Sequence, residues 1–172
     1  VYGRGDIHSL KHLLIGGARF SYGLYNKLKE SLQTINIYNL YGPTEATVYC
    51  CVKKIEFNDD DCRQENISVG KAILNTDIRI VDKDRNEQDM NQVGSLLVGG
   101  IQVMDKYINS EEKNKEIFIV IDKNIYYDTG DLSFIDSNGN IFIVGRSDDS
   151  LKVSGYRVNL SDIDSYIQKL SY

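Results

Sequence analysis

The sequence predicts a mixed fold in which an α/β segment is followed by a region of short β-strands. Two features of the 172-residue chain indicate this. In residues 1–57, apolar runs at strand spacing flank one run at helical spacing, which is typical of a βαβ unit. In residues 66–146, short β-branched runs are separated by turn residues, which indicates a small barrel or a sandwich.

The α/β segment is expected to consist of a strand, a helix and a second strand. His12–Ile15 stops at two glycines, as a buried strand would stop at flexible backbone. Apolar side chains recur at helical spacing in residues 22–32 and predict an amphipathic helix. The alternation in residues 35–40 (INIYNL) predicts the second strand. One βαβ unit is too small to form a stable sheet alone.

The β-rich region contains five runs that we predict to be strands: 77–81, 94–98, 117–121, 132–135 and 141–144. An Asn-Gly step within residues 136–140 predicts a hairpin between the last two. Residues 58–66 are polar and acidic and are expected to be a loop or boundary. One face of residues 161–170 is apolar, which predicts a final helix capped by Ser161.

Composition and charge exclude several classes of protein. Hydrophobic residues make up 41% and charged residues 26%, as in globular proteins, and the net charge of -5 argues against a nucleic-acid partner. The longest apolar run, 117–121, is too short to span a membrane. Three cysteines without disulfide or zinc spacing are expected to be reduced thiols of a cytoplasmic protein. Because the chain begins with Val1, we expect it to be part of something longer.

The stretch 39–48 (NLYGPTEATV) has the strongest functional signal. Gly42 allows a tight turn, and Pro43 suits the first position of a helix. Thr44 and Glu45 would then lie beside unpaired backbone N–H groups, which is an anion-binding geometry. In a phosphate site, Thr44 would be a ligand and Glu45 would bind Mg²⁺. The alternative is that both side chains only cap the helix.

Four further side chains offer contacts to a nucleoside. Tyr41 has a flat face for a base, and Asn39 has an amide edge. Asp131, in a predicted turn at 127–131 (YDTGD), could accept hydrogen bonds from two ribose hydroxyls. Arg146, after the last predicted strand, could pair with ribose or phosphate oxygens. A polar turn and a surface ion pair would explain the last two without a ligand.

Taken in order, these clusters resemble the motifs of the adenylate-forming superfamily, specifically its amino-acid adenylation domains. The D-alanine–carrier-protein ligases and the adenylation domains of nonribosomal peptide synthetases are the most similar branches. The matching segments are 39–45 (NLYGPTE), 94–107 (GSLLVGGIQVMDKY), 127–132 (YDTGDL) and 145–164 (GRSDDSLKVSGYRVNLSDID). The chain departs from the family pattern at Ala18 and Ser95, where glutamate is usual, and at Lys106, where glycine is usual.

The resemblance implies a domain organisation and a set of roles. Residues 1–57 would be a remnant of an N-terminal large domain, 66–146 a small distorted β-barrel subdomain, and 147–172 the hinge and start of a C-terminal lid. The implied nucleotide contacts are Asn39, Tyr41, Gly17, Asp131 and Arg146. Thr44 and Glu45 would be catalytic, with Glu45 holding Mg²⁺, and Asp148 would be the hinge. The implied amino-acid pocket comprises Leu14, Gly16, Leu40 and Val48.

The implied activity is an ATP-dependent ligation. An amino acid would be joined to AMP with release of pyrophosphate, and the acyl group would pass to the phosphopantetheine thiol of a carrier protein. The family's phosphate loop lies upstream of these residues and its lid lysine downstream, so the chain alone is expected to be inactive. The alternative is a non-catalytic nucleotide-binding or carrier-docking module of a degenerate homologue.

Overall fold

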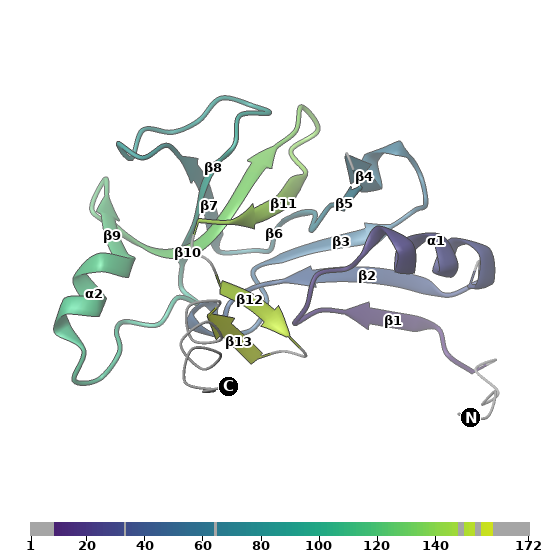
Figure 1. Cartoon of the computed structure of the whole chain (residues 1–172), viewed down its shortest axis with the longest axis horizontal. Coiled ribbons are helices and arrows are strands. Elements are labelled where there is room, and N and C mark those ends of the chain that lie inside the picture. The colour runs from purple at the N-terminus through teal and green to yellow at the C-terminus, as the bar shows by residue number, and fades with distance from the viewer. Residues whose placement is uncertain (1–8, 33, 64, 148–149, 154–155, 160–172) are drawn as a thin grey trace, which may run out of the picture.

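The computed structural model describes residues 9–32, 34–63, 65–147, 150–153 and 156–159 (Figure 1). Two β-sheets form most of this part of the chain. The first has the strand order β1 (His12–Ile15), β2 (Asn36–Tyr41), β3 (Cys51–Ile55) and β6 (Lys71–Ala72). The second has the order β11 (Ile141–Arg146), β10 (Asn124–Ile135), β8 (Gly94–Gly100) and β7 (Thr76–Val81), and β9 (Phe118–Ile121) also pairs with β10. The helix predicted at 161–170 lies outside the described residues.

The predicted βαβ unit is confirmed. β1 and β2 are parallel, and α1 (Tyr22–Ser31) connects them after Ser21, whose hydroxyl accepts a hydrogen bond from the backbone of Leu24. The helix packs Tyr25 into a core cluster with Ile37. The expectation that His12–Ile15 is buried was wrong. β1 is an edge strand here, so its residues alternate in burial and Leu14 is 61% exposed.

The helix predicted after Pro43 was also wrong. Only one 3₁₀ turn, η1 (Thr44–Ala46), follows the proline, which is itself extended. Thr47 and Val48 then have φ angles of 51° and 74°. These positive angles turn the chain back into β3, which pairs antiparallel with β2. Strand pairing therefore overrides the local helix signal.

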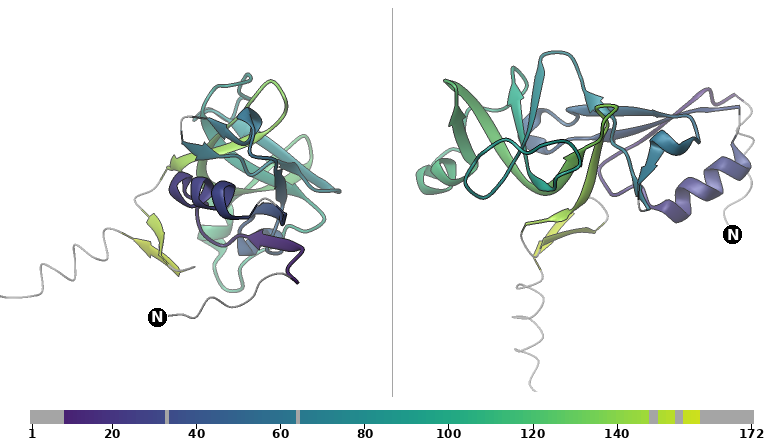
Figure 2. Two further views of the ribbon diagram at one scale, coloured as in Figure 1. Left: turned by 90° about the vertical axis from the view of Figure 1, so that its right-hand side faces the viewer. Right: turned by 90° about the horizontal axis from the view of Figure 1, so that it is seen from above.

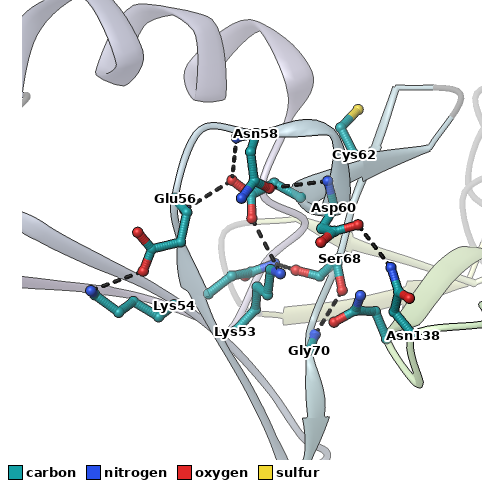
Figure 3. Close-up of polar contacts among 12 residues, drawn as sticks. Lys53, Lys54, Glu56, Asn58, Asp60, Cys62, Ser68, Gly70 and Asn138 are labelled. Carbon is teal, nitrogen blue, oxygen red and sulfur yellow. Dashed lines mark hydrogen bonds and ion pairs between the residues drawn. The ribbon is translucent and has the colours of Figure 1, made fainter.

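The polar stretch expected to be a loop is ordered around a buried carboxylate. It contains the 3₁₀ turn η2 (Asp59–Asp61) and the short strands β4 (Cys62–Arg63) and β5 (Asn66–Ile67). Asp61 is fully buried and accepts hydrogen bonds from the backbone N–H groups of Glu56, at 2.9 Å, and Asn58, at 3.2 Å. Lys53 forms an ion pair with it at 3.3 Å. Figure 3 shows Lys53, Glu56 and Asn58 in this polar network.

All five predicted strands of the second region are present, and every pairing among them is antiparallel. The predicted hairpin joins β10 to β11. The carboxylate of Asp136 accepts hydrogen bonds from the backbone of Asn138 and Asn140, and Gly139 has a φ of 77°. The strand order forms an open path from β11 to β7, so these strands make a half-barrel.

Several elements were not predicted. Besides the short elements η2, β4, β5 and β6, they include β3 and the hairpin of β12 (Ser150–Val153) and β13 (Tyr156–Asn159). In both views of Figure 2 this hairpin projects from the body formed by the two sheets. The helix α2 (Glu111–Ile117), which has no buried residue, was not predicted either. Among the described residues, neither this helix nor α1 has the length and apolar composition needed to cross a membrane.

One apolar cluster joins the two sheets. Ala46 and Cys51, from η1 and β3, pack in it with Leu96, Val98 and Ile141 of the second sheet. An isolated antiparallel bridge between Gly70 and Ile141 adds a backbone link between the sheets. Tyr41 packs against this cluster, so the end of β2 is held against β8 and β11.

Candidate functional site

Three residues predicted to contact a nucleotide meet in one cluster. The hydroxyl of Tyr41, at the end of β2, donates a hydrogen bond to Oδ2 of Asp131 in β10. Nη1 of Arg146, at the end of β11, donates to Oδ1 of the same carboxylate at 2.6 Å. Asp131 is 8% exposed, so the guanidinium balances its charge in a poorly solvated environment. We call Tyr41, Asp131 and Arg146 the carboxylate cluster.

The segment predicted as a turn around Asp131 is instead part of a continuous strand, so that expectation was wrong. β10 runs through it, and its register with β8 shifts between Asp128 and Leu132. The side chain of Thr129 stabilises the irregularity. Its hydroxyl donates to the backbone carbonyl of Leu96 at 2.9 Å and accepts from the backbone N–H of Asp131 at 3.0 Å. The register shift thus fixes the position of Asp131.

Gly130 allows the backbone to approach the guanidinium closely. Its φ angle is 70°, and a Cβ atom there would lie 2.7 Å from Nη2 of Arg146. Its carbonyl accepts two hydrogen bonds from Ser147, one from the backbone N–H at 2.8 Å and one from the hydroxyl at 3.0 Å. A side chain at this position would displace Arg146 from Asp131.

The environment of Tyr41 keeps its phenol protonated. Burial raises the pKa of Tyr41 well above its usual value, and the negative charge and hydrogen bond of Asp131 raise it further. The phenol therefore remains a donor at physiological pH. It neutralises part of the negative potential at Oδ2 without introducing a second charge.

Asn39 lies in the interior rather than at an open edge. It is 3% exposed, and its Nδ2 donates to the backbone carbonyl of Ser68 at 2.8 Å. The Ser68 hydroxyl donates in turn to the carbonyl of Ile141 at 3.0 Å. Nδ2 of Asn39 therefore joins β2 to the segment before β6, and the adenine contact expected for Asn39 stays a prediction.

Thr44 and Glu45 lie in the single turn of η1, so the expected anion site at a helix N-terminus is not present. Thr44 is exposed and Glu45 is half-buried. The hydroxyl of Tyr107 donates to Oε1 of Glu45, and the backbone N–H of Met104 donates to the Glu45 carbonyl at 2.8 Å. The Glu45 side chain is therefore held by Tyr107, in the loop that follows β8.

Glu45 suits a magnesium ion only in combination with phosphate oxygens. In the described part of the chain, no group of three or more His, Cys, Asp or Glu residues could hold a metal ion, and the Glu45 carboxylate forms no ion pair. Mg²⁺ typically binds to one or two carboxylates, substrate phosphates and water. A single carboxylate that forms no ion pair therefore fits the Mg²⁺ expected with a nucleotide.

The residues predicted to form an amino-acid pocket are only partly brought together. Gly16, after β1, lies against β2, because a Cβ there would be 3.2 Å from the carbonyl oxygen of Leu40. It would also be 2.8 Å from Cε1 of Tyr49, a neighbour that sequence reasoning missed. Leu14 and Val48 are exposed, at 61% and 57%. The described contacts therefore bring Gly16 together with Leu40 and Tyr49.

Two predicted residues remain outside these clusters. Gly17 has a φ of 79°, and no described atom would lie within 4 Å of a Cβ placed there, so its backbone is open. Asp148, the predicted hinge, lies outside the described residues.

Comparison with known proteins identifies the class of protein that this fold and site define. The model of the AMP-binding enzyme family matches residues 2–108, which is more than half of the chain. The chain therefore belongs to the AMP-binding enzyme family.

Two relatives show which members of this family the chain is similar to. Gramicidin S synthase 2 from Aneurinibacillus migulanus is 34% identical over 165 residues, which are 94% of this chain and 4% of that protein. The D-alanine–D-alanyl carrier protein ligase from Lacticaseibacillus casei (strain BL23) is 32% identical over 176 residues, covering 99% of this chain and 34% of that protein. The chain thus spans 34% of the length of the carrier protein ligase and 4% of the length of the synthase.

A solved structure supports the same relationship. Holo-PA1221, a nonribosomal peptide synthetase protein containing adenylation and PCP domains, matches with a TM-score of 0.85 at 26% identity. The match covers 96% of this chain and 29% of that one. The predicted resemblance to amino-acid adenylation domains and carrier-protein ligases is confirmed.

Proposed function

We propose that the full-length protein containing this chain is an ATP-dependent ligase that converts an amino acid to its aminoacyl adenylate. It then passes the acyl group to the phosphopantetheine thiol of a carrier protein. The carboxylate cluster is the observation that carries this proposal. It joins three separate family-like segments at one point in the fold.

In this proposal the carboxylate cluster binds the nucleoside. A carboxylate has about four acceptor positions, of which Tyr41 and Arg146 occupy two on Asp131. The remaining positions accept the ribose hydroxyls. Arg146 holds the carboxylate in place and adds positive charge close to the sugar and phosphate. The ring of Tyr41 stacks on adenine, and the open backbone at Gly17 lies beside the nucleotide.

Thr44 and Glu45 act at the phosphates in this proposal. The exposed Thr44 hydroxyl donates to a phosphate oxygen, and Glu45 holds Mg²⁺. When bound, Mg²⁺ offsets the negative charge that develops at the phosphates. The chain itself contributes mainly by positioning these groups while the substrate carboxylate attacks the α-phosphorus and pyrophosphate leaves.

We also propose that the amino-acid substrate binds near Gly16 and Leu40, with Leu14, Val48 and Tyr49 completing that side of the pocket. The Tyr49 ring packs directly against Gly16, because a Cβ at that position would lie 2.8 Å from Cε1 of the ring. The carrier-protein partner is supported by the names of the relatives, one a carrier protein ligase and another a protein with adenylation and PCP domains.

The domain roles expected from the resemblance form part of the same proposal. Residues 1–57 belong to a large domain, 66–146 to a β-barrel subdomain, and 147–172 to a hinge at Asp148 and a lid that reorients between the two half-reactions. All three cysteines are free thiols, which supports the proposed cytoplasmic location.

Exchange of pyrophosphate into ATP by the full-length protein tests this function. We expect exchange that depends on one or a few amino acids, and a loss of at least about tenfold in Asp131→Asn, because hydrogen bonds to a charged group contribute about 1.5–3 kcal/mol. Asp122→Asn is the matched control, since Asp122 is exposed and its ion-pair partner in the described part of the chain is the surface residue Arg79. Nucleotide binding without exchange for any amino acid would instead indicate the non-catalytic module.

A further inference from the structure

Tyr107 lies at the end of the segment 94–107. Its hydroxyl donates a hydrogen bond to Oε1 of Glu45. Three residues earlier, the backbone of Met104 donates to the Glu45 carbonyl at 2.8 Å. Both the main chain and the side chain of Glu45 are therefore held by one short loop, 62 residues away in the sequence.

Tyr107 is itself held in place by α2. The side-chain amide of Asn114 forms two hydrogen bonds with the Tyr107 backbone: Oδ1 accepts from its N–H, and Nδ2 donates to its carbonyl, both at 2.8 Å. Nζ of Lys113 lies 4.4 Å from the centre of the Tyr107 ring, where its charge is attracted to the ring face. The phenol thus has a defined position from which to hold the carboxylate.

We propose that Tyr107 is a positioning residue that orients the Glu45 carboxylate for a metal–nucleotide complex. A glutamate carboxylate rotates freely about its last torsion angle unless a partner holds it. By donating to Oε1, the phenol leaves the other lone pairs of the carboxylate available to a divalent cation. The proposal rests on the assignment of Glu45 to the metal in the proposed function.

The size of the expected effect follows from the contact that Tyr107 makes: it holds the proposed metal ligand Glu45 rather than the metal itself. Carboxylates that bind metals are usually hydrogen-bonded themselves, and removing such a partner typically weakens metal binding by about 10- to 100-fold. Because Glu45 is half-buried and water can partly replace the phenol, we expect the lower end, about tenfold. Nucleotide binding without metal should not change, since the Tyr107 hydroxyl donates to Glu45 rather than to Asp131.

The test is to measure Mn²⁺ affinity of the full-length protein in the presence of ATP, using the electron paramagnetic resonance signal of free Mn²⁺ corrected for the Mn²⁺ that ATP binds without protein. Tyr107→Phe should weaken Mn²⁺ binding about tenfold while metal-free AMP affinity stays within twofold. Asn114→Ala should weaken it in the same direction, by less. In a Glu45→Gln background, Tyr107→Phe should have no further effect, because the carboxylate that it orients is gone.

Tyr126→Phe is a matched control. The Tyr126 hydroxyl also donates to a carboxylate, that of Asp77, and Arg79 lies 5.0 Å from the centre of its ring. The same chemical change at this distant site should leave Mn²⁺ affinity unaltered.

Unchanged Mn²⁺ affinity in Tyr107→Phe, or an equal loss in Tyr126→Phe, would overturn the inference while leaving the proposed function standing. So would a further loss on adding Tyr107→Phe to Glu45→Gln, since the phenol would then act independently of that carboxylate. If the unmodified protein binds no Mn²⁺ with ATP, the metal assignment in the proposed function fails, and the inference fails with it. If Tyr107→Phe does not fold, Asn114→Ala decides between these outcomes.

Discussion

Replacing Gly130 with alanine should disrupt the carboxylate cluster, and the structure provides a matched comparison. Gly130 and Gly139 both have positive φ angles, of 70° and 77°. Alanine is strained in this backbone conformation, which should destabilise the folded state by about 1 kcal/mol or slightly more at either position. Their surroundings differ. A Cβ at Gly139 would lie 3.6 Å from the Lys71 side chain, an ordinary contact, whereas at Gly130 it would lie 2.7 Å from Nη2 of Arg146.

The displaced guanidinium determines the difference between the two variants. Moving Arg146 weakens its 2.6 Å bond to Asp131, and a hydrogen bond between charged groups contributes about 1.5–3 kcal/mol. Gly139→Ala should therefore lower the free energy of unfolding by about 1 kcal/mol, and Gly130→Ala by roughly 2.5–4 kcal/mol, the sum of the two terms. AMP affinity should fall at least about tenfold only in Gly130→Ala.

Urea unfolding and calorimetric titration with AMP, both on the full-length protein, measure these quantities. Equal stability losses in the two variants would show that Arg146 moves aside at no cost. Unchanged AMP affinity in Gly130→Ala would refute the link between the geometry of this cluster and nucleotide binding.

Three further predictions concern stability and use urea unfolding of the full-length protein. Burial, with the charge of Asp61, raises the pKa of Tyr25 from 10.0 to about 12, so the unfolded state ionises first and stability should fall as the pH rises from 10 to 12. Tyr25→Phe should reduce that fall, and an unchanged slope would contradict the assignment. Asp61→Asn should cost about 3 kcal/mol, because Asp61 is a fully buried ion-pair partner, whereas Asp60→Asn, whose side chain is 49% exposed, should cost less than about 0.5 kcal/mol. Asn39→Leu should cost about 1–3 kcal/mol by leaving the buried Ser68 carbonyl without its donor, and a neutral effect would show that water replaces the amide.

The parts of the fold that were predictable are those with a strong local pattern. An apolar run that ends at two glycines located β1, alternating apolar residues located β2, and the Asn-Gly step located the hairpin between β10 and β11. The parts that were missed depend on distant partners. The sequence after Pro43 indicated a helix, but the chain turns back there so that β3 can pair with β2. The helix α2 has no buried residue, so no apolar pattern could have revealed it.

The candidate site was predictable as a set of residues but not as a geometry. A regular hairpin would place Asp131 opposite Gly145, because Ile135 pairs with Ile141. A shift between Leu132 and Ser133 moves the register by one residue, and Asp131 faces Arg146 instead. The sequence gives no local signal for this shift.

The most direct test of the account is whether Asp131 binds ribose hydroxyls. The measurement compares AMP with 2′,3′-dideoxy-AMP by calorimetric titration, for the unmodified full-length protein and for Asp131→Asn. The account predicts that the unmodified protein binds AMP at least about tenfold more tightly than the dideoxy analogue, as charged hydrogen bonds require, and that Asp131→Asn loses most of this preference. An equal preference in both proteins would contradict it and place the ribose elsewhere in the fold.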